Sequence, residues 1–266
     1  METLKYSNLI LDFHGTVTDH QLRSIKSYHR AGHTAFGVHL GKTFYQEVLT
    51  RPSHSKNNGE GQKNKDFIRD RFQEQDSQSI EHFMRVFDKT MGDTFIPIPN
   101  VRATIRELLS LGVNVVLLTN GTKREAIRQT LRDWDKKGDF GIRPLAEKLY
   151  SSHLTGVRKP NEEAVNFIFR DMKSQGIDAS PSNTLLVGDY RDDIQTGLNA
   201  GVDSVLFVRG NGQETFPLKD PRPTYVITQP SELIAIVKGE RSPEGKEMIT
   251  VEPVLWTGEG WYKKHE

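Results

Sequence analysis

Four polar side chains in this sequence stand where chemistry on an anionic group could be carried out. Three of them follow apolar runs of strand character: Asp12 follows NLIL, Thr119 follows VVLL and Asp189 follows LLVG. The fourth, Lys159, comes just before Pro160, a residue that suits the first turn of a helix. Because ligands of open α/β sheets bind at the carboxyl ends of the strands, we expect these side chains to meet at one sheet edge.

Each of the four residues also has an ordinary structural interpretation. The carboxylates of Asp12 and Asp189 suit turns or helix caps. Thr119 suits a buried hydroxyl bonded to the backbone, and Lys159 taken alone suits a solvated surface. An ordinary structural role readily explains one such residue. It does not readily explain four of them in order on one sheet edge, so the set favours a functional site.

Apolar runs alternate with segments of helical periodicity through most of the chain. The runs that predict strands are SNLILDF, VNVVLLTN, KLYSS, TLLVGD, SVLFV and TYVIT. One of the intervening helices is predicted after Pro99 and Asn100, with Gly112 as the residue that ends it. Near-continuous apolar strands joined by helices predict an α/β fold, namely a doubly wound parallel sheet with helices on both faces.

The stretch 18–95 differs from the rest because it is polar and helical and interrupts the alternation after the first strand. We interpret it as an inserted α-helical cap domain that includes a loop-like segment, TRPSHSKNNGEGQKNK. Residues 1–17 and 96–240 then form the core domain. Residues 241–266 form a C-terminal extension that holds two of the three tryptophans. We expect part of it to pack on the core or on a second subunit, which leaves a homodimer open.

The composition argues against several classes of protein. The 266 residues are 35% hydrophobic and 27% charged with a formal net charge of +1, which favours neither nucleic acid nor a membrane surface as a partner. The absence of cysteine excludes thiolate catalysis and cysteine-bound zinc. No apolar stretch approaches the roughly 20 residues needed to cross a bilayer, and the first residues do not resemble a signal peptide, so a soluble, cytoplasmic protein is expected.

The motifs DFHGTV (12–17), LLTN (117–120), RKP (158–160) and VGDYRDD (187–193) occur in an order that resembles the haloacid dehalogenase-like (HAD) superfamily of hydrolases. The resemblance spans about residues 6–238. It implies a Rossmann-like core, and the insert after the first motif corresponds to the helical cap of the superfamily. The combined motifs are a strong signal, although RKP alone carries none.

The resemblance implies roles for Asp12 and for the backbone of His14 in the first motif, and for Asp189. Asp12 would be the nucleophile that attacks phosphorus and forms an aspartyl phosphate, a route that is open to carboxylates. A Mg²⁺ ion would be held by Asp12, Asp189 and the backbone carbonyl of His14. Because that carbonyl belongs to the backbone, a histidine at this position leaves the ligand intact.

The remaining motif residues would support the metal ion and bind phosphate. Asp193 would support the metal ion through water or orient Lys159, and Asp192 is the neighbouring candidate that the family spacing disfavours. Thr119, the Asn120 side-chain amide and Lys159 would hold the phosphoryl oxygens and stabilise the charge of the transition state.

His14 stands where the resemblance implies aspartate in phosphomonoesterases, tyrosine in haloacid dehalogenases and alanine in phosphonoacetaldehyde hydrolases. One interpretation is that its imidazole acts first as general acid and then as general base, since an ordinary imidazole pKa of ~6.5 allows both near neutral pH. The other interpretation is a tolerated substitution at a turn, in an enzyme that is slow or inactive.

The leading hypothesis is a Mg²⁺-dependent phosphatase that acts on a small anionic phosphorylated metabolite beneath a helical cap. A phosphonate (C–P) hydrolase and a catalytically degenerate member that only binds its ligand stay open as alternatives. A dehalogenase is disfavoured because the metal-type carboxylates Asp189 and Asp193 would have no use in it. No motif in 18–95 identifies the substrate.

Two histidines of the insert raise a separate question. His29 and His33 have the i,i+4 spacing at which two residues of a helix can bind one metal ion. No glutamate accompanies them in an HExxH arrangement, and Gly32 weakens the prediction of a helix at this point. We interpret them as ordinary histidines of the insert.

Overall fold

The computed structural model of the chain describes residues 3–50, 60–73, 75–121, 124–136, 144–208, 221–243, 255–256 and 261–262. It divides into two compact units, of which one comprises Met1–Asp19 with Pro97–Glu266 and the other comprises His20–Ile96. No helix in the described part of the chain is both long and apolar enough to span a membrane.

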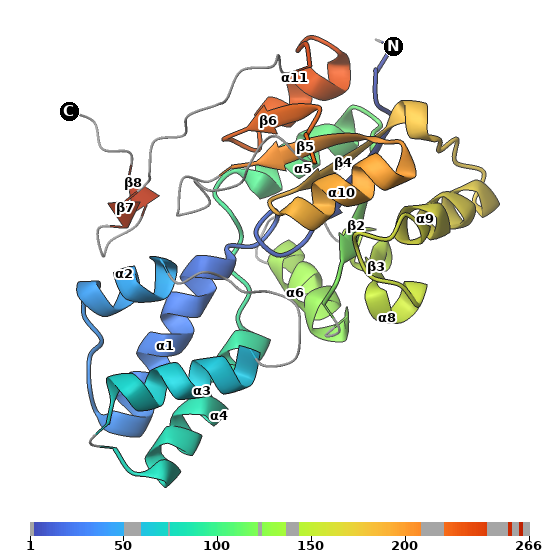
Figure 1. Ribbon diagram of the computed structural model, residues 1–266. Helices are drawn as coiled ribbons and strands as arrows, with labels where there is room; N and C mark the ends of the chain where they lie inside the picture. Colours follow the sequence, from blue (N-terminus) through green and yellow to red (C-terminus); the bar gives the residue numbers. More distant parts are fainter. Residues whose placement is uncertain are drawn as a thin grey trace. The chain divides into compact units, whose positions relative to one another are not determined.

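The larger unit is built on a six-stranded sheet with the strand order β3-β2-β1-β4-β5-β6 (Figure 1). The strands are β1 (Asn8–Asp12), β2 (Asn114–Thr119), β3 (Leu149–Ser151), β4 (Thr184–Gly188), β5 (Asp203–Phe207) and β6 (Tyr225–Ile227). Every neighbouring pair in this order runs parallel. The order reverses between β1 and β4, which is the switch point where open α/β sheets bind ligands. The predicted doubly wound α/β fold is confirmed.

Helices cover both faces of this sheet. Alternate residues of each strand point to opposite faces, and because the strands are apolar at nearly every position, both faces need to be covered. On one face, Ile10 of β1 packs in a buried cluster with Ile168 of α9. On the other face, Leu11 lines a small void with Ile105 of α5 and Leu233 of α11. The helices of this unit are α5 (Val101–Ser110), α6 (Arg124–Lys136), α7 (Pro144–Glu147), α8 (Ser152–Thr155), α9 (Glu163–Ser174), α10 (Arg191–Ala200) and α11 (Glu232–Lys238).

Helix α5 shows how local sequence directs the chain into a strand that carries part of the site. It begins after Asn100, whose φ is 63°, and ends shortly before Gly112, whose φ is 85°. The N–H of Gly112 donates to the carbonyl of Leu109, and the N–H of Val113 donates to that of Leu108, both at 3.0 Å. This left-handed ending at Gly112 leads into β2, as the sequence predicts.

The chain leaves the sheet unit at Asp19 and returns to it at Pro97. The two connecting segments pair with each other, because Thr18 and Pro97 form an antiparallel bridge. The N–H of Ile98 also donates to the carbonyl of Val17 at 3.0 Å. In the sequence, the helical unit is therefore inserted directly after the loop that follows β1.

The smaller unit has an aromatic core. The ring of Tyr28 lies 4.5–6.4 Å, between centroids, from the rings of Phe44, Phe67, Phe83 and Phe87. These five residues come from every helix that the structure describes in this unit, so their packing joins the helices to one another. The helices are α1 (His20–Phe36), α2 (Lys42–Thr50), α3 (Glu60–Arg71) and α4 (Ser77–Asp93).

Helix α3 differs from the sequence prediction, and the C-terminal extension is described only in part. Helix α3 begins at Glu60, inside the segment predicted to be a loop, and its Ile68 is fully buried. Tertiary packing of this helix outweighs the weak helix propensity of its first residues. In the C-terminal extension, β7 (Leu255–Trp256) pairs with β8 (Trp261–Tyr262) in antiparallel fashion. The expected packing of the two tryptophan side chains lies outside what the structure describes.

Candidate active site

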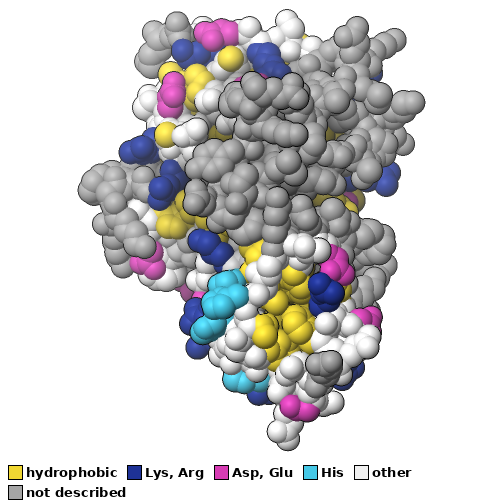
Figure 2. Space-filling view, turned by 90° about the vertical axis from the view of Figure 1, so that its left-hand side faces the viewer, with side chains coloured by type: hydrophobic (Ala, Val, Ile, Leu, Met, Phe, Trp, Pro, Cys, Tyr) yellow, Lys and Arg dark blue, Asp and Glu magenta, His cyan; other side chains and the backbone are white. Residues whose placement is uncertain are grey.

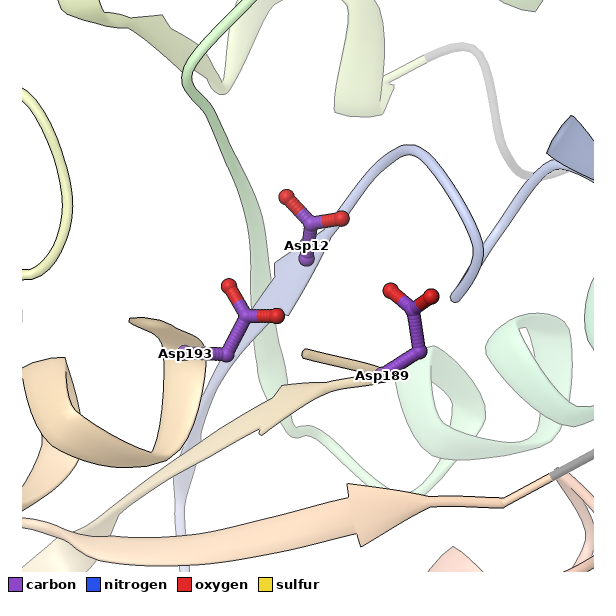
Figure 3. Close-up of side chains that lie close together, drawn as sticks. All are labelled: Asp12, Asp189 and Asp193. Atoms are coloured by element: carbon purple, nitrogen blue, oxygen red, sulfur yellow. The ribbon is translucent and has the colours of Figure 1, made fainter. Parts of the chain in front are cut away.

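Three carboxylates converge at the switch point of the sheet (Figure 3). Asp12 ends β1, Asp189 directly follows β4, and Asp193 lies in the first turn of α10. One oxygen from each lies within 4.8 Å of one oxygen from each of the others. Asp12 and Asp193 are buried, and Asp189 is half-buried. Three anionic groups at this spacing repel one another unless cations lie among them.

Two glycines allow the carboxylates to come this close to the backbone. Gly15 has a φ of 91°, and a Cβ on it would overlap the carboxylate of Asp189. A Cβ on Gly188 would overlap the side chain of Asp193. The glycines of DFHGT and VGD are therefore needed for close approach, and any larger residue would displace a carboxylate.

Lys159 places a cation between two of the carboxylates. Its Nζ donates to Oδ1 of Asp12 and, at 2.5 Å, to Oδ1 of Asp193. It also lies 3.4 Å from the carbonyl of Leu118. Lys159 is only 7% exposed, so the solvated lysine that its sequence context alone suggests is not what the structure contains. A buried lysine of this kind is a structural counter-ion and an available cation for an anionic ligand.

The charges in this cluster depend on burial and on one another. Burial on its own would lower the pKa of Lys159, but Asp12 and Asp193 outweigh it, so that pKa lies above its ordinary value. Burial raises the pKa of Asp12 to about 7, with Lys159 opposing the rise and Asp193 adding to it. Lys159 therefore stays charged, and any further cation at the cluster would favour the ionised form of Asp12.

The side-chain amide of Asn120 is used to position Lys159. Its Oδ1 accepts from the Lys159 N–H at 2.8 Å, and its Nδ2 donates to the Lys159 carbonyl at 3.1 Å. Both polar atoms of this amide are thus bonded to backbone, and because an amide nitrogen carries two hydrogens, the phosphate contact predicted for Asn120 stays a prediction. These two bonds fix the loop that carries Lys159 to the end of β2.

Thr119 and His14 lie together at the same sheet edge. The Thr119 Oγ1 accepts from the Gly121 N–H at 3.0 Å, and as an acceptor there it can still donate its own hydrogen. A Cβ on Gly121 would lie 3.2 Å from Nε2 of His14 and 3.2 Å from Oγ1 of Thr119. The half-buried imidazole, edge-on to Phe13 at 5.1 Å between centroids, therefore occupies space that Gly121 leaves open beside Thr119.

Three further residues belong to this arrangement, although sequence reasoning did not single them out. Oγ1 of Thr16 donates to Asp189 at 3.4 Å, and the N–H of Tyr190 donates to Oδ2 of Asp193 at 3.0 Å. Gly121 makes room for the imidazole. The bond between Tyr190 and Asp193 spans three residues at the start of α10. This is the spacing at which an acidic side chain caps a helix, so the bond could have been predicted. Asp193, and not its half-buried neighbour Asp192, faces Lys159.

The sequence profile of the haloacid dehalogenase-like hydrolase family matches residues 6–201. The chain therefore belongs to the haloacid dehalogenase-like hydrolases. The matched stretch contains all four motifs quoted above, together with the three carboxylates and Lys159. The predicted family membership is confirmed, while the role of the histidine at position 14 stays a prediction.

Relatives of this chain include named phosphatases. A phosphoglycolate phosphatase from Pseudomonas savastanoi pv. phaseolicola is 30% identical over 183 residues, which cover 65% of this chain and 62% of the relative. A glyceraldehyde 3-phosphate phosphatase from Methanocaldococcus jannaschii is 29% identical over 143 residues, which cover 53% of this chain and 57% of the relative. The chain therefore spans less than two thirds of the length of either relative.

Solved structures of HAD hydrolases share the fold. One from Bacillus subtilis, bound to magnesium, has a TM-score of 0.66 at 19% identity and covers 88% of this chain and 99% of its own. Another from Deinococcus radiodurans, with bound phosphate and sodium, has a TM-score of 0.64 at 18% identity and covers 90% and 99% of the two chains. At these identities the likeness concerns the fold.

Proposed function

We propose that this hydrolase is a Mg²⁺-dependent phosphatase that removes a phosphoryl group from a small phosphorylated metabolite. The observation that carries the proposal is the buried Lys159, whose Nζ bonds to Asp12 and Asp193 beside Asp189. A carboxylate nucleophile with a cation at its side is what phosphoryl transfer to an aspartate needs. The relatives named as phosphatases of phosphoglycolate and of glyceraldehyde 3-phosphate support the same reaction and a small substrate.

The donor set at the sheet edge fits Mg²⁺. This ion prefers oxygen ligands, and one oxygen each from Asp12, Asp189 and Asp193 lies within 4.8 Å of the others. We assign Asp12, Asp189 and the backbone carbonyl of His14 as the ligands, with Asp193 in support. Bound there, Mg²⁺ would supply the positive charge that lets an anionic nucleophile approach an anionic phosphate.

The two half-reactions follow from residues of the chain. A carboxylate oxygen of Asp12 attacks phosphorus, the bond from phosphorus to the substrate oxygen breaks, and an aspartyl phosphate forms. Lys159 and the hydroxyl of Thr119 stabilise the charge on the phosphoryl oxygens. A water molecule then attacks the same phosphorus, which releases inorganic phosphate and restores the carboxylate of Asp12.

We assign the proton transfers to His14, whose Nε2 lies on the Thr119–Gly121 side of the site. The imidazolium donates its proton to the leaving oxygen, and the neutral ring then accepts a proton from the attacking water. The histidine thus returns to its starting state after each turnover. A tolerated substitution at a turn would give the ring neither task.

Replacing His14 by alanine is expected to lower kcat/KM for an alkyl phosphate by about 10²–10⁴, because the poor leaving group needs a proton. The loss is expected to be far smaller for p-nitrophenyl phosphate, whose leaving group departs as a stable anion. A His14→Asp variant, which restores an acid, should recover much of the alkyl activity. His153→Ala, at an exposed position on α8, is the matched control. Equal losses on both substrates would show that His14 transfers no proton to the leaving group.

We propose that the helical unit acts as the cap that admits the substrate. In the sequence it is inserted directly after the loop that follows Asp12, between the paired segments at Thr18 and Pro97. The helical unit would then set the selectivity among phosphorylated metabolites. For this reason the catalytic motifs do not identify the substrate.

The proposed function is tested with a panel of phosphorylated metabolites that includes phosphoglycolate and glyceraldehyde 3-phosphate, beside a panel of phosphonates. We expect turnover of phosphomonoesters with Mg²⁺ and none in excess chelator. An Asp189→Asn variant should raise the Mg²⁺ concentration for half-maximal rate by at least about tenfold, because a neutral amide is a weaker ligand than a carboxylate. Undiminished turnover in chelator, or turnover of phosphonates alone, would contradict the proposal.

A further inference from the structure

Three exposed histidines of the helical unit lie close together. His29 and His33 are one turn apart on α1, and His39 lies in the turn that follows this helix. The ring of His39 lies 5.6 Å from that of His29 and 5.1 Å from that of His33, measured between centroids. Figure 2 shows histidine side chains gathered on one surface of this unit. The spacing of His29 and His33 in the sequence does not predict that His39 lies beside them.

The turn that places His39 is fixed by hydrogen bonds and by packing. Gly37 has a φ of 67°, and its N–H donates to the carbonyl of His33 at 3.1 Å, while the N–H of Val38 donates to the carbonyl of Gly32 at 3.3 Å. This is a left-handed helix ending of the kind that glycine favours. The chain thereby folds back towards α1 directly before His39.

Packing against α1 holds the same turn from the other side. A Cβ on Gly32 would lie 3.0 Å from Cγ of Leu40, and Leu40 itself is only 9% exposed. Helix α1 continues through Gly32, the residue that weakens the sequence prediction of a helix at this point. Gly32 leaves the space into which Leu40 packs, and this packing brings the adjacent His39 beside the helix.

The ring of His29 is oriented by a buried residue. Its Nδ1 lies 2.8 Å from the hydroxyl of Tyr45, which is 4% exposed. A histidine that binds a metal ion through one ring nitrogen commonly donates from the other nitrogen to an oxygen of the protein, which fixes the tautomer and the ring orientation. With Nδ1–H donating to Tyr45, the lone pair of His29 is on Nε2.

We propose that His29, His33 and His39 bind a transition-metal ion such as Zn²⁺, at a site separate from the three carboxylates. Imidazole nitrogens suit Zn²⁺, and three of them with a water molecule complete its tetrahedral shell. Zn–N bonds of about 2.0–2.1 Å at tetrahedral angles put the centroids of two bound rings roughly 5 Å apart. The observed centroid distances of 5.1 and 5.6 Å are close to that separation, in rings that have not yet turned towards one centre.

Binding requires the rings to turn towards a common centre. Among the described residues, the carboxylate cluster is the group in which three ligand atoms already lie within 4.8 Å of one another. His33 and His39 are exposed, and exposed side chains change rotamer within picoseconds to nanoseconds. The backbone positions are already set by α1 and the Gly37 turn, so only side-chain rotation remains.

The test is a calorimetric titration of the full chain with Zn²⁺ in excess Mg²⁺, which favours the oxygen ligands of the carboxylates. We expect one Zn²⁺ per chain that is lost, or weakened at least about tenfold, in His33→Ala and in His39→Ala. His82→Ala, at an exposed position on α4 of the same unit, should bind as the wild type does. Zn²⁺ held by the carboxylates would persist in His33→Ala and be lost in Asp189→Asn.

Two further measurements separate a metal site from an exposed histidine patch. Tyr45→Phe removes only the hydroxyl beside His29 and should weaken Zn²⁺ binding by about 10–100-fold. Co²⁺ in place of Zn²⁺ should give the intense visible absorption of a tetrahedral nitrogen site in the wild type and not in His39→Ala. Circular dichroism without metal confirms that each variant is folded. If His33→Ala and His39→Ala match the wild type in stoichiometry and affinity, the three rings are a solvated patch and the proposal is wrong.

Discussion

The Asp12→Asn variant is expected to lose at least about a thousandfold in kcat while its fold stays intact. The amide is nearly isosteric with the carboxylate, but it neither attacks phosphorus nor carries the negative charge of a metal ligand. Lys159 keeps its bond to Asp193 at 2.5 Å, so the buried lysine still has an anionic partner in the variant. The measurement is steady-state turnover of the best substrate from the panel, beside circular dichroism and thermal unfolding.

Two checks make this result decisive. Asp192→Asn makes the same chemical change one residue from the site, on a side chain that does not bond to Lys159, and should keep wild-type activity. Mass spectrometry of the Asp12→Asn protein excludes deamidation back to aspartate. Residual turnover within tenfold of the wild type, in protein free of deamidation, would rule out Asp12 as the nucleophile.

The parts of the fold that could be predicted from the sequence are those set by local signals. The runs NLIL, VVLL and LLVG form β1, β2 and β4, because strands buried on both faces need apolar residues at nearly every position. Gly112 ends α5 as expected, because few other residues adopt its φ of 85°. The meeting of Asp12 and Asp189 at one edge follows from the parallel sheet itself.

The parts that could not be predicted depend on contacts between residues far apart in the sequence. Lys159 and Asp12 are separated by 147 positions, and nothing in RKP shows that this lysine is buried. Nothing in the motif LLTN shows that the amide of Asn120 also bonds to the Lys159 backbone, which lies 39 positions away. Helix propensity alone makes Gly32 a weak position in a helix, whereas the approach of Leu40 explains why a glycine stands there.

The Lys159→Met variant is expected to lose both activity and stability, because methionine keeps much of the length of the side chain and removes its charge. Loss of a cation at the phosphoryl oxygens should lower kcat by at least about a hundredfold. In chelator, removing the cation also leaves Asp12 and Asp193 as buried carboxylates without their counter-ion. Breaking a buried ion pair in this way lowers the free energy of unfolding by about 3–5 kcal/mol.

Added Mg²⁺ is expected to restore part of that stability, because it would bind the same carboxylates in the folded state and so stabilise it by mass action. The gain in free energy of unfolding on replacing chelator by Mg²⁺ should be larger in Lys159→Met than in the wild type, where Lys159 already offsets the repulsion. Denaturant unfolding in the two buffers measures both gains, and Lys173→Met, at an exposed position on α9, serves as the matched lysine control. Equal Mg²⁺ gains in variant and wild type would mean that Lys159 and the metal ion do not share the same carboxylates, and that the ligands assigned to Mg²⁺ are wrong.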